Sequence, residues 1–136
     1  MEVQEILEKI QKEIVLHQKK IVTGIKIGDV VRQGDLYLHR VLEGHPFGEK
    51  TENRQLAPGT TKGSRHRVLE PAKVFIGTTL PEWVTGDGSN FLIGPYIESA
   101  EEIVVIHPEH ADFYLPAGNY QVTYQMDQRT RRRVLD

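Results

Sequence analysis

Apolar residues near the start of the chain recur at steps of three and four, the period of an α-helix. The positions on this face are Val3, Ile6, Leu7, Ile10, Ile14, His17 and Ile21. On the opposite side, Glu5 precedes Lys9 by one turn, which is a favourable orientation for an exposed ion pair. The pattern predicts an amphipathic helix over residues 2 to about 20, within an N-terminal segment that spans residues 1–22.

After residue 22 the helical period gives way to short apolar runs separated by Gly and Pro. These runs predict strands at residues 30–32, 36–42, 67–69, 73–77, 90–93, 102–106 and 119–125. Short strands with this punctuation are typical of a barrel or a sandwich. We therefore expect a mainly β fold, a small antiparallel β-barrel or sandwich over residues 23–136, preceded by one amphipathic N-terminal α-helix.

Two stretches lack the alternation of a strand. Residues 45–65 are polar and contain several Pro and Gly residues, and residues 81–90 end in Thr-Gly-Asp-Gly-Ser-Asn. We interpret both as loops. Long loops in compact domains are often functional or disordered.

Composition places the chain among small soluble proteins of one domain. The 136 residues are 38% hydrophobic and carry a net charge of −2, which gives no general attraction to nucleic acid or to a membrane. The chain has no Cys, which excludes thiolate catalysis, disulfides and Cys-type zinc sites. The acidic start and the absence of a long apolar run favour a cytoplasmic protein with no membrane segment.

Histidines supply the first candidate site. His107 and His110 flank Pro108 and Glu109, and His66 lies about forty residues earlier. Neutral imidazoles bind divalent transition metals, so these three residues could hold such an ion, with Glu109 or Asp112 as a carboxylate ligand. The alternative is that they only hydrogen-bond a turn.

A second candidate lies in the segment Pro58–Arg67. Its glycines, hydroxyls and the cations Lys62, Arg65 and Arg67 could bind an anion through backbone N–H groups. The Gly spacing and the position of Lys62 do not fit a nucleotide-binding P-loop. The alternative is a solvated loop. Trp83, beside the second loop, is either a ligand contact or a hydrophobic lid.

The only dense cationic run lies close to the C-terminus. It contains Arg129, Arg131, Arg132 and Arg133. Such a run could bind phosphate backbones, but no aromatic platform accompanies it, so nucleic-acid binding is the least favoured interpretation. The alternative is a solvated surface, or pairing with Glu98, Glu101 and Glu102.

Several stretches resemble a small bacterial and phage-type family of uncharacterised proteins. The matching stretches are Arg32-Gln33-Gly34-Asp35, Lys62-Gly63-Ser64-Arg65-His66, His107-Pro108-Glu109-His110 and Leu115-Pro116-Ala117-Gly118-Asn119-Tyr120-Gln121-Val122, with Gln125 and Arg133-Val134-x-Asp136. The resemblance implies a shared polar site for a metal or small ligand, with Ser64 where the family has a His. The texture is also similar to cupin-like barrels, by analogy alone.

Together these patterns favour a non-enzymatic domain, an accessory or structural protein, phage-related, that acts through a protein partner or a homo-oligomer. No complete catalytic constellation is present in the sequence. The alternative is a cupin-like protein that binds a divalent transition metal or small ligand through its histidines. A weaker alternative is nucleic-acid binding through the C-terminal arginines.

Overall fold

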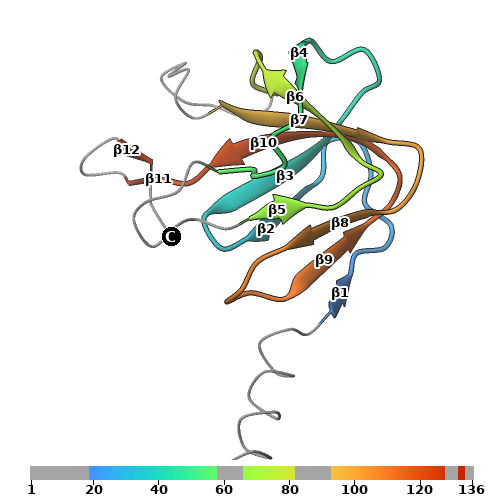
Figure 1. Ribbon diagram of the computed structural model, residues 1–136, viewed down its shortest axis with the longest axis vertical. Helices are drawn as coiled ribbons and strands as arrows, with labels where there is room; N and C mark the ends of the chain where they lie inside the picture. Colours follow the sequence, from blue (N-terminus) through green and yellow to red (C-terminus); the bar gives the residue numbers. More distant parts are fainter. Residues whose placement is uncertain (1–18, 58–65, 82–92, 128–131, 134–136) are drawn as a thin grey trace, which may run out of the picture.

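The computed structural model describes residues 19–57, 66–81, 93–127 and 132–133. These residues form strands and contain no helix, which confirms the predicted mainly β fold. Most strands belong to a larger or a smaller sheet, and Figure 1 shows how these pack together. The predicted N-terminal helix falls almost entirely on residues 1–18, which lie outside the described residues.

The larger sheet has six strands in the order β2-β3-β10-β7-β6-β4, all paired antiparallel. Its members are β2 (Val30–Gln33), β3 (Leu36–Val41), β10 (Gly118–Tyr124), β7 (Ile93–Ser99), β6 (Lys73–Gly77) and β4 (Phe47–Thr51). Strand β10 lies in the middle and joins the β2–β3 hairpin to the three strands on its other side.

The smaller sheet has four strands in the order β1-β9-β8-β5. They are β1 (Lys19–Ile21), β9 (Asp112–Leu115), β8 (Ile103–Ile106) and β5 (Arg67–Val68). β1 pairs with β9 in parallel, an exception to the predicted antiparallel arrangement. Two short strands, β11 (Met126–Asp127) and β12 (Arg132–Arg133), form a separate pair.

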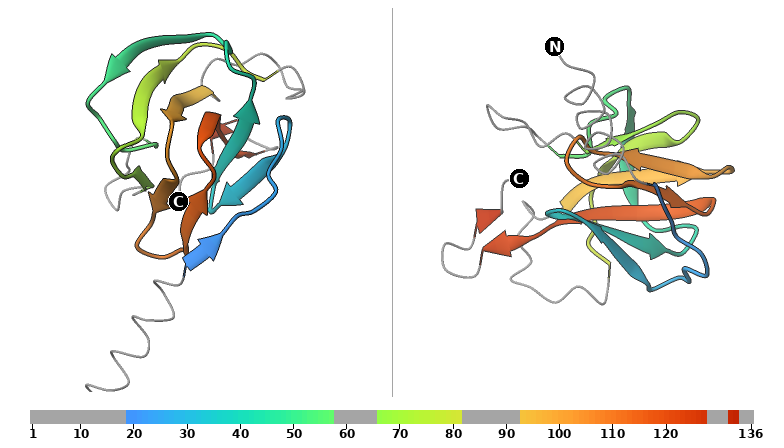
Figure 2. Two further views of the ribbon diagram at one scale, coloured as in Figure 1. Left: turned by 90° about the vertical axis from the view of Figure 1, so that its right-hand side faces the viewer. Right: turned by 90° about the horizontal axis from the view of Figure 1, so that it is seen from below.

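The described strands do not close into a barrel. No named strand of the larger sheet pairs with one of the smaller sheet. Figure 2 shows the strands from two further sides. The barrel alternative of the sequence prediction is therefore wrong for the described residues. The two-sheet arrangement follows because β1 and β2, at neighbouring edges, are joined by the turn-rich residues 22–29 and not by a ladder.

The hydrophobic core lies between the two sheets. Alternate residues of each strand face it, as the two-residue period of a strand requires. The larger sheet contributes Leu36, Leu38, Val74, Ile97, Tyr120, Val122 and Tyr124, and the smaller sheet contributes Val68, Ile103, Val105, Phe113 and Leu115. Burial of these side chains is the main source of stability.

The opposite face of the larger sheet is also covered near β7. The ring of Phe47 stacks on the ring of Tyr96, with centroids 4.4 Å apart and an interplanar angle of 8°. The ring of His45 also stacks on that of Tyr96, with centroids 6.0 Å apart. Burial, with smaller contributions from the negative charges of Glu98 and Glu43, raises the pKa of Tyr96 to about 12. Tyr96 is therefore a neutral packing residue.

Three boundaries predicted from the sequence are wrong. Lys19–Ile21 form β1 and not the end of the helix, because parallel pairing with β9 outweighs the helical spacing of Ile21. Phe47–Thr51, predicted as loop, form β4, an edge strand that needs few apolar residues. The strand predicted at 90–93 begins, among described residues, at Ile93 and continues to Ser99.

The extension of β7 passes through Gly94 and Pro95, two residue types that usually weaken or interrupt a strand. Gln121 pairs with Tyr96 and Thr123 pairs with Ile93, so the register shifts between them. Because Gly94 and Pro95 fall within this irregularity, the strand tolerates a residue that has no N–H to donate.

Candidate functional site

His66 is fully buried between the sheets, directly before β5. The backbone from His66 to Val68 is fixed by hydrogen bonds to residues 54–56. The Leu56 N–H donates to the His66 carbonyl at 2.8 Å, and the Val68 N–H donates to the Arg54 carbonyl at 3.1 Å. The imidazole consequently has a defined position beside the turn that joins β2 to β3.

Both ring nitrogens of His66 face polar groups from that turn. Nδ1 lies 2.8 Å from Oε1 of Gln33, and Nε2 lies 3.0 Å from Oδ1 of Asp35. Gln33 and Asp35 are themselves about 1% and 2% exposed. Gly34 lies between them with φ of 61°, a conformation that glycine adopts without strain and that allows both flanking side chains to point inward.

The amide of Gln33 is oriented by the smaller sheet. Its Nε2 donates to the carbonyls of Val105 at 3.1 Å and Ala111 at 2.8 Å, so its Oε1 must be the atom that faces His66. Nδ1 of His66 therefore carries a hydrogen. One further proton lies between Nε2 and the Asp35 carboxylate, which gives either an ion pair or a neutral acid–imidazole pair. This network ties the two sheets together.

His107 and His110 complete a histidine cluster with His66. The ring centroids of His66 and His107 are 4.4 Å apart, those of His107 and His110 are 4.4 Å apart, and those of His66 and His110 are 6.1 Å apart. His107 is buried and His110 is half-buried. The structure thus brings together the three histidines predicted as metal ligands.

The nitrogens of the cluster are directed largely toward protein groups. Both nitrogens of His66 are engaged, and Nδ1 of His107 accepts a hydrogen bond from the Glu109 N–H at 3.0 Å, which places the hydrogen of a neutral ring on Nε2. Among the described residues, no group of three or more His, Cys, Asp or Glu side chains has the arrangement that holds a metal ion. The cluster as it stands is a packed polar network.

The other predicted site residues are not brought to this cluster by any described contact. Arg67 is exposed on β5, opposite Ile106. Lys62, Arg65 and Trp83 lie outside the described residues. Arg129 and Arg131 also lie outside the described residues. Arg132 and Arg133 are the two residues of β12.

Sequence reasoning missed the roles of Gln33 and Asp35. Both belong to the stretch Arg32-Gln33-Gly34-Asp35, which contributed to the family resemblance, but the Gly-Asp pair indicated only a turn. The sequence did contain a signal, because a Gln and an Asp flank the turn glycine Gly34. Where such a hairpin turn is buried, these two polar side chains need hydrogen-bond partners, and they find one in His66.

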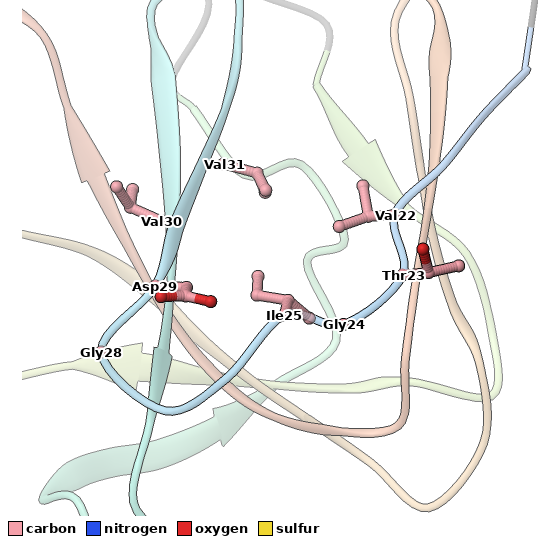
Figure 3. Close-up of a pocket in the computed structure, with 8 residues that line it drawn as sticks. All are labelled: Val22, Thr23, Gly24, Ile25, Gly28, Asp29, Val30 and Val31. Atoms are coloured by element: carbon pink, nitrogen blue, oxygen red, sulfur yellow. The ribbon is translucent and has the colours of Figure 1, made fainter.

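A second site lies where the two sheets fail to close. Residues 22–25 and β2 border a groove of about 440 Å³, lined by Val22, Thr23, Gly24, Ile25, Gly28, Asp29, Val30 and Val31. Figure 3 shows the side chains of Val22, Ile25 and Val31 converging on the space between the two segments. Ile27 and Val30, close by, are 52% and 48% exposed.

Strand β2, which borders this groove, differs from the other sheet edges. β1 carries Lys19 and Lys20, β4 carries Glu49 and Lys50, and β5 carries Arg67. Such charges discourage pairing with another chain. β2 begins with two valines and also carries Arg32, whose guanidinium donates to the Gly34 carbonyl and to Oε1 of Gln125. Among the described strands β2 pairs only with β3, so its other edge is a candidate to accept a further strand.

His39, on β3, provides a prediction about pH. Burial lowers the pKa of His39 from 6.5 to about 4, and its Nε2 lies 2.7 Å from the Thr123 hydroxyl. The unfolded chain therefore binds a proton more readily than the folded one between pH 6.5 and 4. This contribution to stability is complete above pH 6.5 and is lost as the pH falls toward 4.

We expect the loss to be on the order of 1–2 kcal/mol after allowance for solvent screening. Urea unfolding at pH 7, 5.5 and 4.5 measures it. His39→Gln keeps a polar group beside Thr123 but cannot titrate, and it should lose less stability over this interval. An identical pH dependence in both proteins would contradict the assignment.

In the part of the chain that the structure describes, no helix is long and apolar enough to span a membrane. Comparison with curated proteins and with solved structures finds no match. A family model described as a domain of unknown function, DUF8820, matches residues 32–125, a range that includes Gln33, Asp35 and all three histidines of the cluster. This match spans more than half of the chain and agrees with the resemblance to an uncharacterised family: the chain belongs to the DUF8820 domain family.

Proposed function

We propose that this domain is a non-catalytic interaction domain, an accessory or structural component that acts through protein or oligomer contacts. The observation that carries the proposal is the open edge of β2 beside this groove. An extended segment of another chain would pair with the outward backbone groups of β2 and place alternate side chains against Val22, Ile25 and Val31.

The composition of the groove supports this kind of ligand. Its lining combines branched apolar side chains with the carboxylate of Asp29, whose Oδ2 accepts the Lys26 N–H at 2.8 Å and so belongs to a stable turn. This groove offers a ligand contact area and a complementary shape. Its lining contains one titratable side chain, Asp29, and so no pair of residues for acid–base catalysis. The resemblance to bacterial and phage-type proteins supports placing the component in a cytoplasmic bacterial or phage assembly.

Val30→Lys tests the proposal. A lysine places a charge on the exposed valine at the start of β2, and charges on an edge strand discourage pairing with another chain. We therefore expect the variant to lose the oligomer or the stoichiometric partner that the natural chain retains, without a change in the unfolding midpoint. Light scattering after size-exclusion chromatography, over a range of concentrations, measures the assembly.

The matched control is Ile76→Lys. Ile76 is 54% exposed, similar to Val30, but it lies on β6, which has a neighbour on each side. Ile76→Lys should retain the assembly. A natural chain that is strictly monomeric and purifies without a partner would contradict the proposed function.

A second candidate function is binding of a divalent transition metal or a small ligand at the histidine cluster. The convergence of the His66, His107 and His110 rings favours it. Because both nitrogens of His66 are engaged, His107 and His110 would have to supply the ligand atoms after rearrangement. Elemental analysis of the untagged protein, compared with a His107→Ala/His110→Ala variant, distinguishes stoichiometric metal from an empty site.

A further inference from the structure

The outer face of the smaller sheet is unusually apolar along β8, which reads Ile103-Val104-Val105-Ile106. Ile103 and Val105 are fully buried in the core, so Val104 and Ile106 point to the other side of the sheet. A strand with one solvated face normally alternates apolar and polar residues, whereas a continuous apolar run is typical of a strand covered on both faces. The sequence of β8 therefore predicts a cover over this outer face.

The apolar surface continues across the whole sheet. Val104 pairs with Tyr114 on β9, and Tyr114 pairs with Ile21 on β1, so the three side chains share the outer face. Leu69, whose N–H donates to the Val104 carbonyl at 2.9 Å, extends the row beyond β5. Ile21 is 67% exposed and Leu69 is 38% exposed. We call these four residues the outer row.

Cations border the outer row. The ammonium group of Lys19 lies 5.0 Å from the centre of the Tyr114 ring, and Arg67, which pairs with Ile106 of β8, is exposed on β5. A complementary ligand would have an apolar stripe flanked by acidic residues.

The residues directly before β1 supply an apolar stripe with more acidic than basic residues beside it. Their sequence carries apolar residues at the helical spacing 3, 6, 7, 10 and 14, glutamates at 2, 5, 8 and 13, and lysines at 9 and 12. A helix over residues 2–14 is about 20 Å long, which is close to the width of about 14 to 19 Å of a four-stranded sheet. Residues 15–18 are sufficient for a connection to Lys19, since αβ connections of two to six residues are common.

We propose that residues 2–14 pack as an amphipathic helix on the outer row of the same chain, which would then have a third layer. This cover is separate from the β2 groove, so it does not depend on the proposed function. Tethering through β1 favours the intramolecular contact, because the effective concentration of a segment on a short connection is high.

The absence of cysteine permits a direct test in the full chain. The variant Ile10→Cys/Val104→Cys is treated at low protein concentration with a short bismaleimide cross-linker, and products are separated by mass. We expect one cross-link within a single chain in high yield. The matched control Ile10→Cys/Ile76→Cys places the second thiol on β6 of the larger sheet and should give little intramolecular product.

Each alternative result overturns the proposal in a different way. Cross-linked dimers would show that the helix packs on a second copy of the chain. Equal yields for both cysteine pairs would show that the N-terminal segment has no fixed position on the domain. If a cysteine pair disturbs folding, the variants Ile10→Ala, Ile21→Ala and their combination replace it. Shifts of the urea midpoint that are less than additive support the contact, and additive shifts contradict it. The Val30→Lys result is unaffected in every case.

Discussion

Replacing His66 by alanine should destabilise the domain by about 3 kcal/mol or more, because it leaves two buried polar side chains without a partner, at about 1–3 kcal/mol each. The change leaves the Asp35 carboxylate without its partner at 2% exposure, and the second oxygen, Oδ2, already has no hydrogen-bond partner among the described residues. It also leaves Oε1 of Gln33 unpaired, while the amide stays fixed by its two carbonyl partners. Urea unfolding near pH 7 measures the loss.

The matched control uses Asp35→Asn, which retains the shape of the side chain but removes its charge. In the Asp35→Asn background, His66→Ala should cost less than in the natural protein, because no carboxylate remains buried without a counter-ion. A loss below about 1 kcal/mol for His66→Ala alone would show that water reaches Asp35, and the inter-sheet network would then have little energetic importance.

Gly77→Ala should reduce stability by about 3 kcal/mol or more, the upper part of the range for overpacking. A Cβ at this position would lie 1.8 Å from the Gly94 carbonyl oxygen, 2.8 Å from Nε2 of Gln121 and 3.0 Å from Cγ2 of Ile93. The closest of these atoms belongs to the backbone of β7, so relief requires β6 and β7 to separate. A decrease in the thermal midpoint and in the urea midpoint measures the effect.

Gly48→Ala is the matched control for this substitution. Gly48 is also a strand glycine, but it lies on the edge strand β4, and its nearest contact would be 3.1 Å from the Ile76 carbonyl oxygen. The edge can move by a few tenths of an ångström, so we expect a change of no more than about 1 kcal/mol. Similar losses for both variants would mean that the effect arises from strand propensity and not from the close approach to Gly94.

The strands that could be predicted from the sequence are those in which side-chain alternation and burial coincide. Leu36 and Leu38 on β3 and Val122 on β10 are examples. Prediction failed where the information lies in the partner strand. β4 is an edge with a burial pattern of mostly exposed residues, and β1 is specified by its register with β9 and not by its own period.

The candidate sites, like the strands, were only partly predictable from the sequence. The three histidines could be selected from spacing, and the structure brings their rings together, because β5 and the end of β8 are neighbours in one sheet. Sequence spacing contains no information about hydrogen-bond direction, however. The engagement of His66 by Gln33 and Asp35 from the other sheet required the three-dimensional arrangement. The β2 groove had no sequence signature, because it arises from a gap between two edges.

The central position of β10 has a consequence for how the protein acquires its structure on the ribosome. Until residues 118–124 have been synthesised, β3 and β7 have no common neighbour, and the larger sheet consists of two separate pieces with open edges. β1 must also wait for β9, which is encoded close to β10. Pairings between distant parts of a chain form slowly, and incomplete sheets aggregate. A nascent chain of this domain should therefore depend most on chaperone protection until β10 has left the ribosome and can pair with β3 and β7.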